Sequence, residues 1–111
     1  NLGIVYFRRG QLYEASGEFE WARKLMPGNP DPRINLAITL ESAGRTTEAL
    51  ATFRTALEIA PESIAGIQGL AALQFRTGQT DSQTSEHLRE IALRGEDESW
   101  RRWAQAKLAE R

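Results

Sequence analysis

The apolar residues of this chain recur at helical spacing along almost its whole length. Leu36, Ala37 and Leu40 lie at the i, i+1 and i+4 spacing of one helix face, and Gly44 follows where a helix would end. No stretch shows the strict alternation of apolar and polar residues that is typical of a β-strand. The pattern therefore predicts an all-α protein.

Glycine and proline divide this pattern into seven predicted helices. The turns fall at Gly10, residues 27–32, Gly44, Pro61, Gly78 and Gly95. The predicted helices cover approximately residues 1–9, 12–26, 32–43, 46–59, 63–77, 81–94 and 97–110. Because the connections between them are short, we expect successive helices to be antiparallel neighbours.

The same sparse set of residues returns every 34 positions. Leucine recurs at Leu2, Leu36 and Leu70, each followed by a small residue, and glycine recurs at Gly10, Gly44 and Gly78. In the first two copies the second helix repeats an alanine, a phenylalanine, an alanine and a proline, at Ala15, Phe19, Ala22 and Pro27 and again at Ala49, Phe53, Ala56 and Pro61. One helical hairpin cannot bury its apolar faces alone, so a repeat of this kind predicts stacked copies that share a core.

This spacing resembles the tetratricopeptide repeat. The resemblance implies a right-handed α-solenoid of antiparallel helix pairs that forms a single domain over residues 1–111. Its parts would be repeat 1 at residues 1–30, truncated at its start, repeat 2 at 31–64, repeat 3 at 65–96 and a capping helix at 97–111.

Repeat 3 departs from the pattern after Gly78. Its second helix fits only with one inserted residue, which places Thr84, Leu88 and Ile91 where alanine, phenylalanine and alanine stand in the other copies. The closing proline is replaced by the region of Gly95.

The resemblance also implies a concave surface lined by the first helix of each repeat. At 100° per residue, Ile34 and Ile38 lie about 200° from Leu36, so they cannot share the face that Leu36 buries. By resemblance, this second stripe points into the concave groove. The predicted partner-binding residues are Asn1, Ile4, Phe7, Arg8, Ile34, Asn35, Ile38, Ser42, Gln68, Ala72, Phe75 and Arg76. The alternative is that Ile34 and Ile38 pack against neighbouring repeats.

Composition argues against an enzyme and against several classes of partner. The formal net charge is −1, so the chain lacks the basic footprint of a nucleic-acid-binding protein. No apolar run approaches the roughly 20 residues that would cross a bilayer. The chain has no cysteine and only one histidine, His87, which we expect to face solvent. We therefore expect no catalytic residue, metal site, cofactor, nucleic-acid partner or membrane insertion, and the compartment is open, with the cytoplasm as the default.

Two groups of aromatic residues fall outside the predicted groove. Trp100 and Trp103 lie on the apolar stripe of the last helix among basic residues, which suits either a cap over the final repeat or a membrane-surface helix. The acidic residues that balance this helix favour the cap. Tyr13 and Trp21 occupy positions that are usually polar and outward. They would either pack against a segment removed by truncation or mark a second contact surface.

The sequence thus predicts a non-catalytic module that binds a short segment of a partner protein in its concave groove. The competing hypothesis is a structural unit that forms homo-oligomers, either through an open N-terminal end or through the convex aromatic residues.

Overall fold

The computed structural model describes residues 1–110, which form seven α-helices and no strand. In chain order the helices are α1 (Leu2–Arg8), α2 (Leu12–Leu25), α3 (Asp31–Ser42), α4 (Thr46–Ile59), α5 (Ile64–Thr77), α6 (Thr84–Arg94) and α7 (Glu98–Ala109). The predicted all-α class and the predicted helices are confirmed. The chain forms two compact units, unit 1 over Asn1–Pro61 and unit 2 from Glu62 onward.

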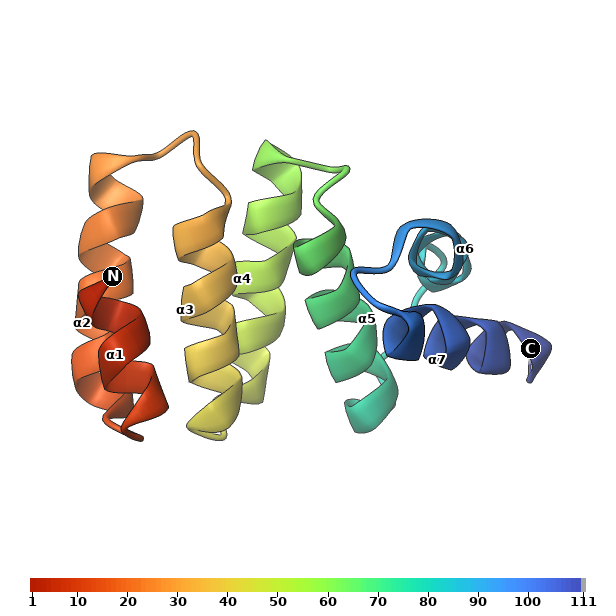
Figure 1. Cartoon of the computed structure of the whole chain (residues 1–111), viewed down its shortest axis with the longest axis horizontal. Helices are drawn as coiled ribbons and strands as arrows, with labels where there is room; N and C mark the ends of the chain where they lie inside the picture. The colour runs from red at the N-terminus through yellow and green to blue at the C-terminus, as the bar shows by residue number, and fades with distance from the viewer. Residues whose placement is uncertain (111) are drawn as a thin grey trace. The chain divides into compact units, whose positions relative to one another are not determined.

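Unit 1 consists of two helical hairpins side by side (Figure 1). Each helix packs against the next one along the chain, from α1 to α4. The repeated alanine and phenylalanine positions form its interior, with Ala15, Ala49, Phe53 and Ala56 fully buried. Gly3 marks the closest approach, because a Cβ atom there would lie 2.6 Å from Cε1 of Phe19. The absence of a side chain at Gly3 therefore makes room for Phe19 of α2.

The turn glycines repeat in three dimensions as they do in the sequence. Gly10, Gly44 and Gly78 have φ angles of 75°, 78° and 70°, a left-handed conformation that glycine adopts without a steric penalty. After each glycine the next backbone N–H donates to the carbonyl five residues earlier, at N···O distances of 2.9, 2.9 and 2.8 Å. This hydrogen bond is the Schellman pattern that closes a helix and starts the return of the chain.

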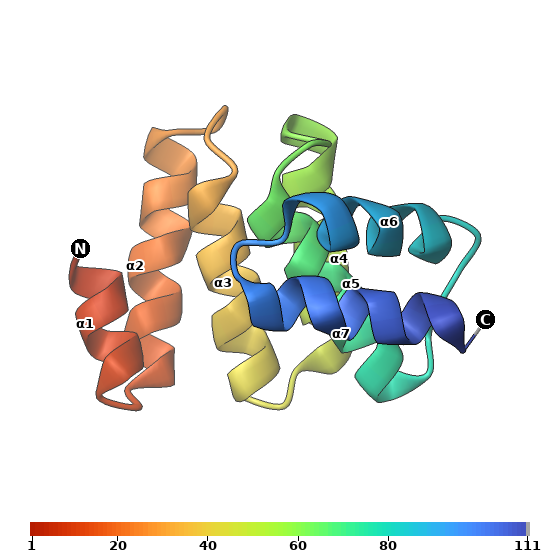
Figure 2. The same ribbon diagram turned by 45° about the vertical axis from the view of Figure 1, so that its right-hand side comes forward.

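Unit 2 starts like a repeat and then departs from it. Leu70 and Ala71 of α5 are buried, and Thr84, Leu88 and Ile91 of α6 are fully buried as the inserted residue predicts. However, α6 crosses α5 steeply, as Figure 1 shows by viewing α6 nearly end-on where α5 is seen along its length. α7 then packs alongside α6 (Figure 2).

The predicted start of α6 differs clearly from the observed one. We expected this helix from residue 81, but it begins at Thr84. The side chain of Asp81 accepts hydrogen bonds from the backbone N–H of Gln83 at 2.9 Å and from Nε2 of Gln74 at 3.0 Å. The backbone N–H of Asp81 donates to Oγ1 of Thr84 at 2.8 Å. These local side-chain bonds compete with helical backbone bonds, so the helix starts one turn later.

α7 forms the end of the described chain. Asp97 caps its first turn by accepting a hydrogen bond from the backbone N–H of Trp100 at 2.9 Å. The rings of Trp100 and Trp103 lie edge to face with centroids 5.6 Å apart, and Ala104 is buried. Within residues 1–110, no helix is both long enough and apolar enough to cross a membrane.

Candidate protein-binding surface

One face of α3 remains accessible on an otherwise buried helix. Asn35, Ile38 and Ser42 fall within about 60° of one another at 100° per residue. Ile38 is 38 % exposed, Ser42 is exposed and Asn35 is half-buried. This face combines an apolar side chain with an amide that can both donate and accept hydrogen bonds.

α1 carries the equivalent face 34 residues earlier. Asn1, Ile4 and Arg8 occupy the repeat positions of Asn35, Ile38 and Ser42. Arg8 is exposed and Ile4 is half-buried. Asn1 differs from its counterpart because it caps α1, where its Oδ1 accepts from the backbone N–H of Gly3 at 2.8 Å. Its acceptor oxygen is therefore used within the helix.

Ile34 does not lie on this accessible face, although the sequence analysis placed it there. Its side chain is only 4 % exposed. α3 packs against both α2 and α4, so it buries more than one side. Ile34 lies about 60° from the fully buried Ala37, whereas Ile38 lies about 100° from it. The prediction that Ile34 lines a groove is wrong, and the alternative that it packs inside the protein describes it correctly.

The predicted groove residues of α5 are largely covered by the chain that follows them. Gln68 is buried, its Nε2 donates to Oε1 of Glu96 at 2.6 Å, and its Oε1 accepts from the backbone N–H of Glu96 at 2.8 Å. Because both the Nε2 and the Oε1 of Gln68 are hydrogen-bonded within the protein, its assignment to an open groove is wrong.

Phe75 is partly covered by α7. Its ring meets Trp103 edge to face with centroids 5.7 Å apart, and Nζ of Lys107 lies 5.4 Å from the ring centroid. Ala72 is half-buried and Arg76 is exposed on the same helix. The accessible predicted residues of unit 1 are those of α1 and α3. We call them the first-helix face, which consists of Asn1, Ile4, Phe7, Arg8, Asn35, Ile38 and Ser42.

Comparison with protein families agrees with this architecture. A tetratricopeptide repeat model matches residues 6–73, well over half of the chain. The chain belongs to the tetratricopeptide repeat family. Its seven helices correspond to about three repeats followed by a capping helix.

A curated relative contains the same kind of repeat. Over 80 residues, which are 72 % of its length, this chain is 34 % identical to "TPR repeat-containing thioredoxin TTL4" of Arabidopsis thaliana. The matched part makes up only 12 % of that relative. The likeness therefore concerns a small part of a much longer protein.

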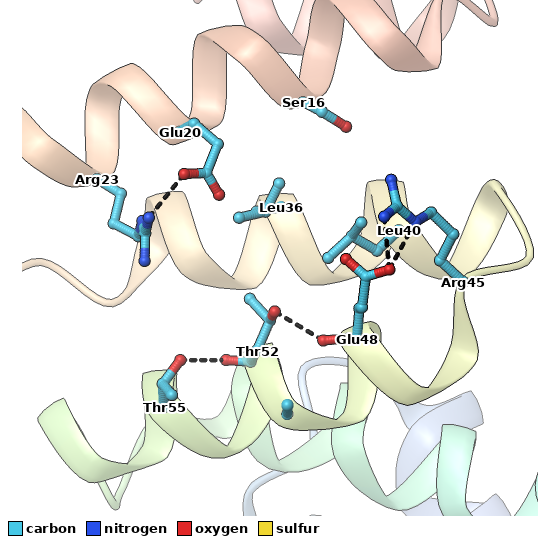
Figure 3. A pocket seen from close by; sticks show the side chains of 10 residues that line it. Ser16, Glu20, Arg23, Leu36, Leu40, Arg45, Glu48, Thr52 and Thr55 are labelled. Atoms are coloured by element: carbon cyan, nitrogen blue, oxygen red, sulfur yellow. Dashed lines mark hydrogen bonds and ion pairs between the residues drawn. The ribbon is translucent and has the colours of Figure 1, made fainter.

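The tetratricopeptide repeats of unit 1 also form a pocket that sequence reasoning missed. It has a volume of about 320 Å³ and lies between α2 and α4, with Leu36 and Leu40 of α3 as its apolar floor (Figure 3). Ion pairs between Glu20 and Arg23 and between Arg45 and Glu48, each with a shortest N···O distance of 2.6 Å, flank it. The remaining lining residues are Ser16, Ala51, Thr52 and Thr55.

This pocket lies on a different side of α3 from the first-helix face. Leu36 is about 100° from Asn35, and Leu40 is about 160° from Ser42. The sequence assigned both leucines to the core because their spacing is that of a buried stripe. The only sequence signal of the pocket was the placement of opposite charges three residues apart on α2 and at the start of α4.

Two aromatic side chains of this repeat protein stand in solvent. Tyr13 is 89 % exposed and Trp21 is 60 % exposed, both on α2. Gly17 lies midway between them, and a Cβ atom there would meet no other atom within 4 Å. The expectation that these residues point outward is confirmed.

His87 differs from its expected position. It is half-buried rather than solvent-facing, and its Nδ1 is buried without a hydrogen-bond partner. Burial lowers the pKa of His87, and the negative charges of Asp81, Glu86 and Glu90 oppose this shift. Among the residues that the structure describes, no three His, Cys, Asp or Glu side chains are grouped to hold a metal ion.

Proposed function

We propose that this tetratricopeptide repeat protein is a non-catalytic interaction module that binds a short segment of a partner protein on its first-helix face. One observation carries the proposal. α3 leaves Ile38 exposed beside Asn35 on a helix whose other apolar residues are buried, and α1 places the half-buried Ile4 and the exposed Arg8 at the equivalent repeat positions.

The chemistry of the face defines the segment it suits. Ile4 and Ile38 offer contact to apolar side chains, and the amide of Asn35 can bond to both the N–H and the C=O of a peptide backbone. Arg8 provides charge-assisted donors for a carboxylate. A matching ligand is an extended or helical segment with apolar residues and at least one acidic residue. We expect a dissociation constant of about 1 μM or weaker, because the face is small and the segment must be ordered on binding.

The proposal includes no redox activity. The Arabidopsis relative is described as a thioredoxin, but thiol–disulfide exchange requires cysteine thiolates and this chain contains no cysteine. What supports the interaction role is the family itself, whose stacked helices present broad surfaces to other proteins.

The direct experiment is an NMR titration with acidic, apolar peptides selected from a display library. We expect the perturbed backbone amides to map to α1 and α3. Ile38→Glu and Asn35→Ala should each weaken binding about 10-fold or more, as changes at the centre of an interface do, with the fold intact. Leu93→Glu on α6 is the matched control, because Leu93 is an apolar residue that is 78 % exposed far along the sequence from this face.

Salt separates the charged contact from the apolar ones. Arg8→Ala should weaken binding more at low ionic strength than at high ionic strength, because exposed charges are screened by salt. If the perturbed amides instead map to α2 and α4 and Ile38→Glu binds as well as the unchanged chain, the first-helix face is not the binding surface.

A further inference from the structure

The exposed aromatic residues of α2 are symmetric about a glycine. Tyr13 lies four residues before Gly17 and Trp21 lies four residues after it, so all three follow one i, i+4, i+8 ridge along the helix. Tyrosine and tryptophan bury large areas and are enriched in the energetic centres of protein interfaces. Two such side chains flank a position without a side chain, which leaves a gap in the ridge.

This spacing is self-complementary. If two α2 helices cross in opposite directions at Gly17, Tyr13 of each copy lies beside Trp21 of the other. The crossing point then has no side chain on either helix, so the two backbones can approach closely. A two-fold interface of this kind buries the same patch on both copies and forms a closed dimer rather than a filament.

The charges of α2 are unevenly distributed along the helix. Glu14 and Glu18 lie in its first half, and Arg23 and Lys24 lie in its last turn, where Arg23 is neutralised by its ion pair with Glu20. Antiparallel crossing at Gly17 places Lys24 of one copy opposite position 10 of the other, about one turn before Glu14, and it sets the two helix dipoles in opposite directions.

We propose that unit 1 forms a two-fold dimer with a second copy of this chain through α2, centred on Gly17, with Tyr13 and Trp21 as the principal contacts. This surface is separate from the first-helix face, because it lies on α2, whereas the proposed peptide site lies on α1 and α3. The chain would therefore present two peptide-binding faces per dimer.

Sedimentation over a range of concentrations tests the dimer. The unchanged chain should pass from monomer to dimer, and Tyr13→Ser combined with Trp21→Ser should abolish dimer formation. Gly17→Gln should weaken dimerisation about 10-fold or more while leaving the thermal midpoint unchanged or higher, since glutamine favours helix and has open space at this position. Leu2→Ser on α1 and Leu93→Ser on α6 are controls at other exposed leucines and should dimerise normally.

Cross-linking tests the symmetry axis. Because the chain has no cysteine, Gly17→Cys introduces a single thiol, and mild oxidation should link two copies rapidly if the helices cross there. Gly28→Cys, in the exposed loop after α2, should remain largely unlinked.

Each contrary result overturns the proposal. A chain that stays monomeric at the highest concentration has no such dimer. Association that survives Gly17→Gln but is lost in Leu2→Ser uses α1 instead. If Gly17→Cys forms disulfide-linked dimers no faster than Gly28→Cys, the dimer is not centred on Gly17. The same slow linkage is expected if α2 binds a different protein. None of these outcomes affects the peptide titration, which reports on α1 and α3.

Discussion

The two units share the start of the repeat signature but differ in the side chains that they bury. In unit 1 the only buried polar side chain is Thr39, whose hydroxyl donates to the backbone carbonyl of Asn35 in its own helix at 2.8 Å. In the described part of unit 2, Gln68, Gln74 and Thr84 are all buried, and each bonds to a residue outside its own helix.

The difference shows two ways of holding helices together. Apolar contacts in unit 1 have no direction, so small residues such as Gly3 and Ala37 determine how closely the helices approach. Hydrogen bonds in unit 2 do have direction, and they hold the steep crossing of α6 and the turn before α7. A buried amide is stabilising only when its partners are present, so the geometry of unit 2 depends on individual residues more than that of unit 1 does.

The largest expected effects come from the shared core position. Phe53→Ala in unit 1 should lower the free energy of unfolding by about 3–5 kcal/mol, and Leu88→Ala at the matching position of unit 2 by about 2–5 kcal/mol, because both side chains are fully buried. Urea denaturation followed by circular dichroism measures both. The control Leu93→Ala, at an exposed position, should change it by less than about 0.5 kcal/mol. If Leu88→Ala is as mild as this control, the inserted-residue register of unit 2 is wrong.

A smaller effect should distinguish the two interiors. Gln68→Leu leaves the backbone N–H and the carboxylate of Glu96 without their partner, and should lower the stability by about 1–3 kcal/mol. Thr39→Val in unit 1 removes only a bond within one helix, so we expect less than about 1 kcal/mol. Thermal unfolding of the two variants gives the comparison. Equal losses would show that the polar contacts of unit 2 are no more important than the one in unit 1.

The sequence predicted the parts of this fold that depend on residues close together in the chain. Helix ends follow from Gly10, Gly44 and Gly78 because each needs a left-handed backbone, and the helical period identified the core at Phe53 and Leu88. The tetratricopeptide repeat could be identified because a fixed period of sparse residues reflects helix contacts that recur in each copy.

The errors concern contacts that no local pattern records. Gln68 and its partner Glu96 are 28 residues apart, and nothing near Gln68 in the sequence indicates that its amide is occupied. Ile34 was assigned to the wrong side because α3 has neighbours on two sides, whereas one hydrophobic stripe predicts only one. The peptide-binding role of the remaining first-helix face stays a prediction.

Substitutions at two glycines should separate a conformational requirement from a steric one. Gly44 has a φ of 78° and open space around it, so Gly44→Ala should lower the stability by about 1–2 kcal/mol and Gly44→Asn by less, since asparagine tolerates this conformation. Gly95 has an ordinary φ, but a Cβ atom there would lie 2.7 Å from the carbonyl oxygen of Ile91. Asparagine at position 95 should therefore be no better than alanine. If Gly95→Asn proves milder than Gly95→Ala under the same denaturation assay, steric crowding is not what requires this glycine.

The placement of the three tryptophans means that intrinsic fluorescence reports mainly on unit 2. Trp100 and Trp103 lie edge to face and half-buried in unit 2, whereas the single tryptophan of unit 1, Trp21, stands mostly in solvent. Indole emission moves to longer wavelength when its surroundings become aqueous, so unfolding of unit 2 should shift the spectrum and unfolding of unit 1 should barely change it. Replacing Trp21 by phenylalanine would leave an emission signal from unit 2 alone. The order in which the two halves melt could then be followed without attaching a dye.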